Sequence, residues 1–220
     1  MKKSGKRILC RGVLLIVLFV VWTVLIQTVD VQKIGETGTE VGFATFNGWF
    51  HQLTGVHMLI YTITDWLGLV PIFICLVFGG IGFVQMLKRK SLLKVDLDII
   101  LLGIYYVVVI LGYLVFEMIP INYRPIFIEG RMEASYPSST TLLVLSVMPT
   151  LVFQVWRRGL KADTKKGISI VTIFFSVFMV ICRLISGVHW FTDIIAAILL
   201  SIGLFFMYKG FVLLLCKDEK

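Results

Sequence analysis

The chain has 220 residues, of which 58% are hydrophobic, and its mean hydropathy is +0.95. These values exclude a water-soluble globular domain of this size and indicate an integral membrane protein, expected to form one membrane-embedded domain over residues 1–220. The formal net charge of +8 would suit a protein that binds nucleic acid, but the distribution of the charges, described below, argues against nucleic acid as a partner.

Six long apolar segments follow one another along the chain, and each is read as a membrane-spanning helix. We therefore predict an all-α, polytopic membrane protein. The expected spans are residues 12–29, 66–87, 97–119, 141–156, 167–188 and 193–216. No small-residue cleavage site follows the first span, so we expect a retained helix rather than a signal peptide. The four cysteines form no C-x-x-C pair, which predicts neither a disulfide framework nor a metal site.

The first connection, residues 30–65, is polar and then aromatic. Its large apolar side chains recur at roughly helical spacing: Phe43, Phe46, Trp49, Phe50 and Leu53. Such a pattern is typical of an amphipathic helix that lies on the membrane surface. His51 and His57 occur in the same connection, but no partner motif accompanies them, and we assign them no chemical role.

Basic residues gather on one side of the predicted membrane. With six spans, both termini lie on the same side as connections 88–94 and 157–166. These four segments, with the C-terminal one taken from Lys209, hold 17 of the 21 Lys and Arg residues. Basic loops remain in the cytoplasm. We therefore expect cytoplasmic termini, a location in the plasma membrane, and a connection 120–140 that faces outside. Membrane topology then explains the positive net charge.

The segment Cys182–Asp193, C-R-L-I-S-G-V-H-W-F-T-D, places three ionisable side chains between two spans. Arg183, His189 and Asp193 are costly at a membrane boundary, and such residues are candidates for function. His189 and Asp193 share a face if the last helix has already begun. A carboxylate there orients one ring nitrogen and leaves the other as a base or nucleophile. The alternative is a histidine that caps a transmembrane helix, beside a snorkelling Arg–Asp pair.

A second polar group precedes the fourth span. Arg124 and Arg183 both offer forked N–H donors that suit phosphate oxygens. The Y-P-S-S-T stretch puts Ser138, Ser139 and Thr140 at a helix N-terminus, where free amides and the helix dipole bind anions. An equally simple interpretation is that these hydroxyls only cap the helix. The predicted topology brings all of these segments to the outer face, so we expect them to converge there.

These residues resemble the signatures of the type-2 phosphatidic acid phosphatase superfamily, membrane lipid phosphatases related to vanadium haloperoxidases. The stretches similar to its first, second and third signatures are Arg124-Pro125, Pro137-Ser138-Ser139-Thr140 and Arg183-x5-His189-x3-Asp193. The resemblance implies two catalytic residues, His189 and Asp193. It implies phosphate binding by five more: Arg124, Arg183, Ser138, Ser139 and Thr140. It also implies a phosphohistidine intermediate on the outer face, formed without a metal or other cofactor.

Three positions depart from the family pattern. Glu117 replaces the lysine that opens the first signature, and Cys182 replaces the serine that opens the third. Thr140 stands where the family has a histidine that protonates the leaving oxygen, and threonine cannot donate a proton near neutral pH. An alkoxide leaving group, with a pKa of roughly 15, needs that proton, whereas a lipid monophosphate has a second pKa of about 6. We therefore expect a prenyl diphosphate, such as undecaprenyl diphosphate, as substrate, unless Glu129 or Glu133 replaces the acid.

Three alternatives stay open from the sequence. The departures allow a catalytically impaired family member that binds or moves phospholipids. A lipid phosphotransferase, in which a second lipid replaces water, would use the same residues. A structural membrane scaffold would leave the spacing of Arg183, His189 and Asp193 to chance. The expected partners are the bilayer and a lipid phosphate or diphosphate, and the sequence does not indicate an oligomeric state.

Overall fold

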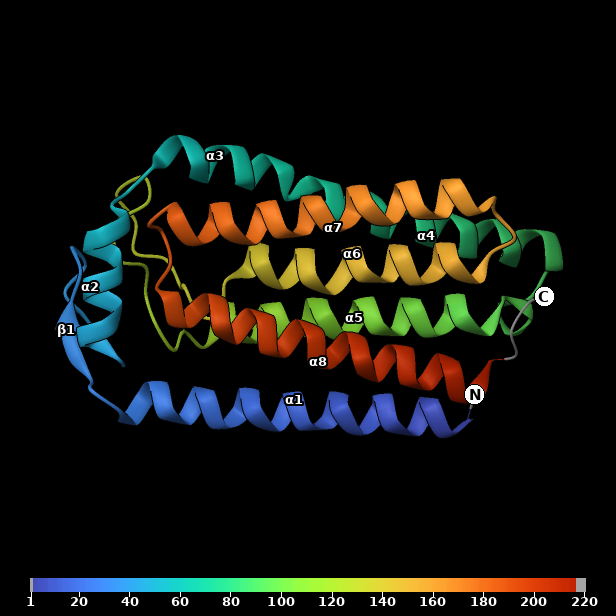
Figure 1. Cartoon of the computed structure of the whole chain (residues 1–220), viewed down its shortest axis with the longest axis horizontal. Helices are drawn as coiled ribbons and strands as arrows, with labels where there is room; N and C mark the ends of the chain where they lie inside the picture. Colours follow the sequence, from blue (N-terminus) through green and yellow to red (C-terminus); the bar gives the residue numbers. More distant parts are fainter. Residues whose placement is uncertain (1, 217–220) are drawn as a thin grey trace.

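The computed structural model describes residues 2–216, which form an elongated helical bundle with a small cap at one end (Figure 1). The elements in chain order are α1 (Lys2–Thr28), β1 (Gln32–Ile34), β2 (Thr39–Val41), α2 (Ala44–Thr54), α3 (Met58–Leu67), α4 (Leu69–Arg89), the 3-10 turn η1 (Leu92–Lys94), α5 (Leu97–Met118), α6 (Ser139–Arg157), α7 (Ala162–Ile185) and α8 (Phe191–Leu215). Helix α1 begins and α8 ends at the same end of the bundle, opposite the cap (Figure 1).

Six helical segments are long and apolar enough to cross a membrane, so the chain is a multi-pass membrane protein. Large apolar side chains cover the outside of the bundle, as Leu14, Phe73 and Phe174 illustrate. Several helices extend beyond the predicted spans at their basic ends. Thus α1 begins at Lys2 and α7 at Ala162. Lysine and arginine lower the hydropathy of these ends but are good helix formers, which explains the difference.

The second span is longer than predicted. It covers Met58–Arg89 as the two helices α3 and α4, which meet at Gly68. The prediction began this span at Trp66 because it took the polar connection, which contains several threonines, to end at Asp65. In the structure Thr64 is fully buried, and the hydroxyl of Thr62 donates to a carbonyl of its own helix. Both polar groups are therefore compatible with a spanning helix.

Helix α6 lies inside the bundle and packs against α4, α5, α7 and α8. Helix α1 packs along α8, and glycines allow the two backbones to approach. A Cβ atom on Gly12 would lie 2.9 Å from the backbone nitrogen of Met207, and one on Gly210 would lie 3.1 Å from that of Leu9. Small residues at such crossings are the usual means of close packing between membrane helices.

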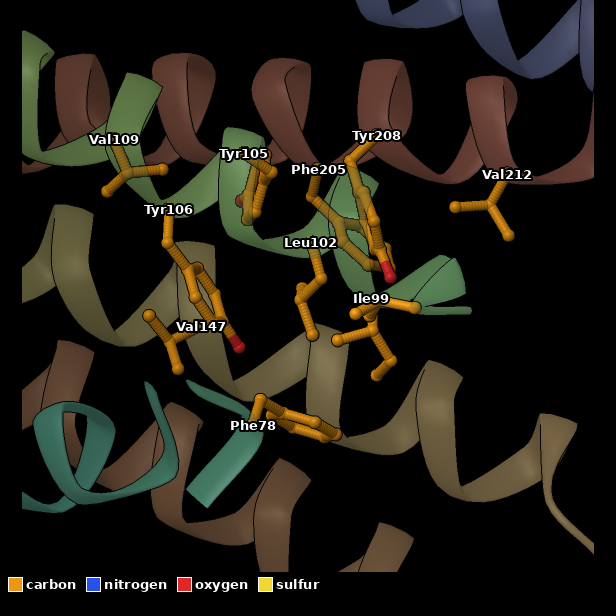
Figure 2. Close-up of a cluster of buried hydrophobic side chains, with 11 residues drawn as sticks. Phe78, Ile99, Leu102, Tyr105, Tyr106, Val109, Val147, Phe205, Tyr208 and Val212 are labelled. Atoms are coloured by element: carbon orange, nitrogen blue, oxygen red, sulfur yellow. The ribbon is translucent and has the colours of Figure 1, made fainter. Parts of the chain in front are cut away.

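The largest buried cluster joins α4, α5, α6 and α8 (Figure 2). Tyr105 and Tyr208 stack with their ring centroids 5.1 Å apart. The hydroxyl of Tyr105 donates to the carbonyl of Ser146 (2.9 Å), and that of Tyr208 accepts from Nε2 of Gln154 (2.7 Å). Because the buried hydroxyls are hydrogen-bonded, the cluster stabilises the relative positions of α5, α6 and α8.

The cap consists of the β1–β2 hairpin, α2 and the connection 119–138 (Figure 1). The hairpin is antiparallel, with Lys33 opposite Glu40. The N–H of Glu36 donates to the carbonyl of Pro125 (2.8 Å), which ties the hairpin to the connection 119–138. The sequence analysis did not foresee these strands, because three-residue segments carry no periodic signal.

Helix α2 covers residues of the predicted amphipathic helix and lies across the cap end of the bundle (Figure 1). Trp49 and Leu53 on this helix are 56% and 67% exposed. The position of α2 on a membrane surface stays a prediction, as does the cytoplasmic location of the termini.

Candidate active site

The connection 119–138 folds back on itself beside the start of α8. The N–H of Arg124 donates to the carbonyl of Glu133 (3.0 Å). The indole N–H of Trp190 donates to the carbonyl of Tyr123 (2.8 Å). These bonds bring the first predicted arginine next to the loop between α7 and α8.

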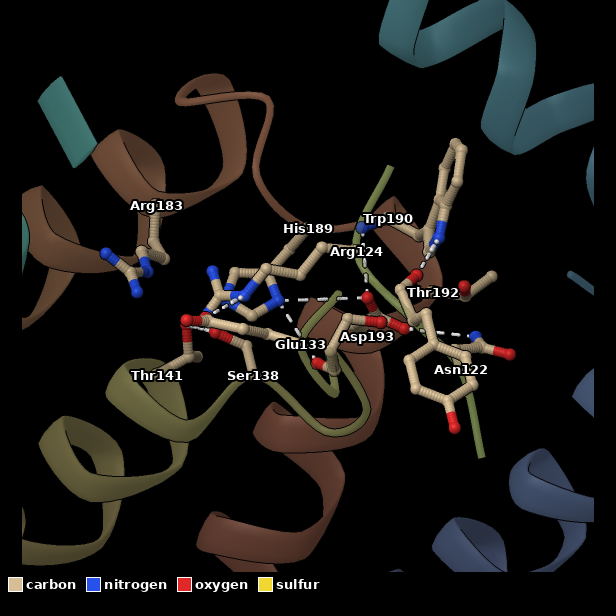
Figure 3. Close-up of polar contacts among 12 residues, drawn as sticks. Asn122, Arg124, Glu133, Ser138, Thr141, Arg183, His189, Trp190, Thr192 and Asp193 are labelled. Atoms are coloured by element: carbon tan, nitrogen blue, oxygen red, sulfur yellow. Dashed lines mark hydrogen bonds and ion pairs between the residues drawn. The ribbon is translucent and has the colours of Figure 1, made fainter. Parts of the chain in front are cut away.

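His189 lies in this loop, at the centre of the polar contacts drawn in Figure 3. Its Nδ1 atom lies 3.1 Å from the carbonyl oxygen of Ser135 and 3.8 Å from Oδ2 of Asp193. A carbonyl oxygen only accepts hydrogen bonds, so the network assigns the proton to Nδ1 and the lone pair to Nε2. Nε2 is buried and has no hydrogen-bond partner among residues 2–216. A buried nitrogen with a free lone pair can act as a nucleophile towards a bound ligand.

Asp193 is fully buried and holds the loop before α8. Its Oδ2 atom accepts the N–H of Trp190 (3.0 Å), and its Oδ1 atom accepts from Nδ2 of Asn122 (3.2 Å). The carboxylate therefore satisfies an amide at the start of the helix. We predicted that Asp193 would orient Nδ1 of His189. In the structure the carbonyl of Ser135 is closer to that nitrogen, so the orientation depends on both groups.

Arg124 and Arg183 are buried, and each keeps N–H groups without a partner. Within the described part of the chain, Nη1 of Arg124 and Nε of Arg183 make no hydrogen bond. Nε of Arg124 lies 3.0 Å from Oε2 of Glu133, an ion pair without hydrogen-bond geometry. Buried guanidinium groups that keep N–H atoms without a hydrogen-bond partner fit an anion with several acceptor oxygens, such as phosphate. Residues 2–216 contain no group of three His, Cys, Asp or Glu side chains placed to hold a metal ion.

The surroundings of His189 keep its ring neutral. Burial lowers the pKa of His189 well below the ordinary value of 6.5, and the positive charges of Arg124 and Arg183 lower it further. The hydrogen bond to Ser135 opposes these effects only in part. Both guanidiniums therefore act on the ring electrostatically, and Nε2 is unprotonated near pH 7.

The predicted hydroxyl residues stand at the start of α6, with Ser138 as N-cap. The N–H of Ser138 donates to the carbonyl of Asp193 (3.2 Å), and its hydroxyl donates to Oγ1 of Thr141 (3.1 Å). The amide of Ser138 is thus engaged within the protein. The amides of Ser139 and Thr140 belong to a first helical turn, which offers no intrahelical acceptor. Phosphate binding by these three residues stays a prediction.

An apolar cavity of about 490 Å³ lies between α4, α5 and α6, beside this turn. Asp65, Ser139 and Thr140 line the cavity where it approaches the site. Thr140 faces α4, since a Cβ atom on Gly68 would lie 3.7 Å from its methyl carbon. The polar site therefore adjoins an apolar space, an arrangement that suits an amphiphilic ligand.

Four residues of the site were missed by sequence reasoning. Ser135 holds His189 through a backbone carbonyl, which has no residue-type signature. Asn122 is a single polar residue in a polar connection. Tyr61 and Asp65, which contact the arginines, lie in the predicted connection 30–65, where no motif marks them.

Comparisons with known proteins were consistent with this geometry. The model of the PAP2 superfamily matches residues 95–214. This segment contains α5, α6, α7 and all of α8 except Leu215. The structure is similar to the crystal structure of the first transmembrane PAP2 type phosphatidylglycerolphosphate phosphatase from Bacillus subtilis. The TM-score is 0.67, with 19% sequence identity, over 94% of this chain and 98% of that chain. At this identity the likeness shows the fold. No curated protein sequence matches the chain.

Proposed function

This chain belongs to the PAP2 superfamily of membrane lipid phosphatases, and from that premise we propose that it hydrolyses a lipid diphosphate through His189. The observation that carries the proposal is the unpartnered Nε2 atom of His189, which is buried beside two arginines with free N–H groups. A phosphoryl group would supply an electrophilic phosphorus for the imidazole and acceptor oxygens for the guanidiniums.

The reaction has two steps. In the first, Nε2 of His189 attacks phosphorus in line and the bond to the leaving oxygen breaks, which gives a phosphohistidine and a lipid monophosphate. The Nδ1 proton stays on the ring, held by the carbonyl of Ser135 with Asp193 nearby. Arg124 and Arg183 stabilise charge on the equatorial oxygens. In the second step water attacks phosphorus, the P–N bond breaks, and both water protons leave on inorganic phosphate.

The kind of leaving group can be inferred from the absence of a general acid among the described residues of the site. Besides Asp193, two carboxylates border the site, and each faces an arginine: Asp65 lies 3.7 Å from Arg183, and Glu133 lies 3.0 Å from Arg124. In an ion pair with arginine a carboxylate serves as an acceptor and not as a proton donor. Thr140 provides no acid either. A leaving group of low pKa is therefore favoured, which supports a lipid diphosphate, such as undecaprenyl diphosphate, over a phosphomonoester.

The surroundings of the site support a lipid substrate on the outer face. The apolar cavity beside Thr140 offers space for part of a hydrocarbon chain. The basic connections 88–94 and 157–166, the start of α1 and the end of α8 lie at the opposite end of the bundle. The positive-inside rule then favours a site that opens at the outer surface of the plasma membrane.

A phosphate-release assay tests the proposal. The protein is given either a prenyl diphosphate or phosphatidic acid, and we expect phosphate to be released faster from the diphosphate. General acid catalysis typically contributes about 10²–10⁴-fold to a rate, and this range is the upper bound of the expected difference. His189→Ala should abolish release and the trapped phosphohistidine. Equal rates would contradict the leaving-group argument. Tight lipid binding without release would identify a member that binds or moves lipid, and a phosphorylated second lipid would identify a phosphotransferase.

A further inference from the structure

Helix α3 lies outside the matched segment 95–214, yet it forms one wall of the candidate site. It packs against α7, which carries Arg183. Tyr61, Thr64 and Asp65 are spaced so that they share one face of α3. All three contact Arg183. The family segment thus supplies the arginine, and a helix outside that segment supplies its partners.

These contacts occupy the two terminal nitrogens of Arg183. Nη1 donates to Oγ1 of Thr64 (3.2 Å) and to the carbonyl oxygen of Tyr61 (3.4 Å). Nη2 lies 3.7 Å from Oδ1 of Asp65. Nε has no partner among the described residues, although Arg183 is only 1% exposed. The guanidinium is therefore held at its far edge, and the N–H that remains is available to an anion.

The ring of Tyr61 faces both arginines. Cζ of Arg183 lies 4.8 Å from the ring centroid, and Cζ of Arg124 lies 5.7 Å from it. Two neighbouring guanidiniums repel each other, most strongly before an anion binds between them. The negative face of an aromatic ring attracts a cation and offsets this repulsion. The ring of Tyr61 thus gives both cations a common favourable contact at the site.

We infer that α3 positions the two arginines for a phosphoryl group, with the ring of Tyr61 as their common contact and Thr64 and Asp65 as anchors of Arg183. The inference rests on the proposed function, because it takes the arginines to be phosphate ligands. Donors that are already in place stabilise the charge of a transition state without reorganisation. Tyr61, Thr64 and Asp65 act through the arginines and are positioning residues.

Four variants separate this role from a general effect on folding. The hydroxyl of Tyr61 makes no hydrogen bond within residues 2–216, so Tyr61→Phe keeps every contact of the ring. Tyr61→Leu removes the aromatic face but keeps an apolar side chain. Asp65→Asn removes the ion pair at a side chain that is 59% exposed. Leu59→Ala is the matched control, because Leu59 is 74% exposed on the same helix.

Orthovanadate, a mimic of the phosphoryl transition state, is titrated into the full-length protein in detergent, and thermal unfolding is followed in parallel. We expect Tyr61→Phe and Leu59→Ala to bind vanadate as the wild type does. Tyr61→Leu should bind about 5- to 30-fold more weakly because a desolvated cation–π contact is lost. Asp65→Asn should bind about 2- to 5-fold more weakly, since its ion pair is partly exposed.

The outcomes distinguish this inference from the proposed function. Vanadate affinity that is unchanged in Tyr61→Leu, while the wild type binds, would overturn the positioning role and leave the phosphatase proposal standing. An equal loss in Tyr61→Phe would also overturn it, because the ring would not be the cause. If Tyr61→Leu does not fold, an unchanged affinity in Asp65→Asn decides against the inference. A wild-type protein that binds neither vanadate nor inorganic phosphate would overturn the phosphate site itself.

Discussion

The Nδ1 atom of His189 donates its hydrogen to the backbone carbonyl oxygen of Ser135, 3.1 Å away. No side-chain substitution removes a backbone acceptor. The tautomer that leaves Nε2 free therefore has a support that does not depend on Asp193, whose Oδ2 atom lies 3.8 Å from Nδ1.

Asp193→Asn should accordingly lower the rate of phosphate release by about 10- to 100-fold, well short of the about 10⁴-fold seen where a carboxylate alone fixes the tautomer of a catalytic histidine. The remaining loss reflects the weaker stabilisation of the phosphorylated ring. Steady-state rates are compared with those of His189→Ala, which lacks the nucleophile. Equal losses in the two variants would show that the carbonyl of Ser135 does not suffice.

The lowered pKa of His189 predicts a ring that stays neutral in mildly acidic solution. A group whose folded pKa lies below its ordinary 6.5 takes up its proton only when the pH falls through that lower value. The chain has three histidines, so the double substitution His51→Gln, His57→Gln leaves one. Labelled-histidine NMR of that variant should show a neutral ring at pH 6. A midpoint at or above pH 6.5 would mean that water or an anion solvates the site.

Thr140→His should restore the missing acid. The side chain at this position borders the apolar cavity, so there is room for an imidazole. We expect hydrolysis of a phosphomonoester to rise, by at most about 10²–10⁴-fold, and hydrolysis of a diphosphate to change little. Thr140→Gln is the control, because glutamine is polar and close to histidine in bulk but has no proton to transfer. A rise in both variants would point to space rather than to acid catalysis.

The contact between α1 and α8 makes a prediction about stability. Gly12→Ala puts a Cβ atom 2.9 Å from the backbone nitrogen of Met207, and backbone cannot easily move away. We expect a loss of about 1–3 kcal/mol in the free energy of unfolding. Gly79→Ala is the matched control, since nothing lies within 4 Å of a Cβ atom there, and alanine should stabilise that helix by up to about 1 kcal/mol. Thermal unfolding in detergent measures both, and equal shifts would contradict close packing.

The fold was largely predictable because hydropathy and length identify spans in a membrane protein. All six spans were found. The span boundaries were wrong where polar residues face the inside of the bundle. An example is α3, where Thr64 is buried and contacts Arg183. Hydropathy averages over a helix and does not distinguish a lipid-facing from an inward-facing threonine.

The part of the candidate site that depends on residue type and spacing was predictable from the sequence. The structure brings His189 and Asp193 together with Arg124 and Arg183 in one buried region, although their chemical roles stay predictions. The carbonyl that holds His189 was not foreseeable, because any residue at position 135 would present one. Long-range contacts of this kind depend on tertiary packing, which a single sequence does not encode in a local pattern.

The β1–β2 hairpin and α3 support the loop and helix that carry the two arginines, through Glu36 to Pro125 and through Asp65 to Arg183. Both supports precede residue 95, where the family match begins. A chimera that carries only the matched residues in a foreign scaffold would contain the reactive side chains but not the contacts that position them. We expect such a chimera to be active only when it also contains the β1–β2 hairpin and α3 of this protein.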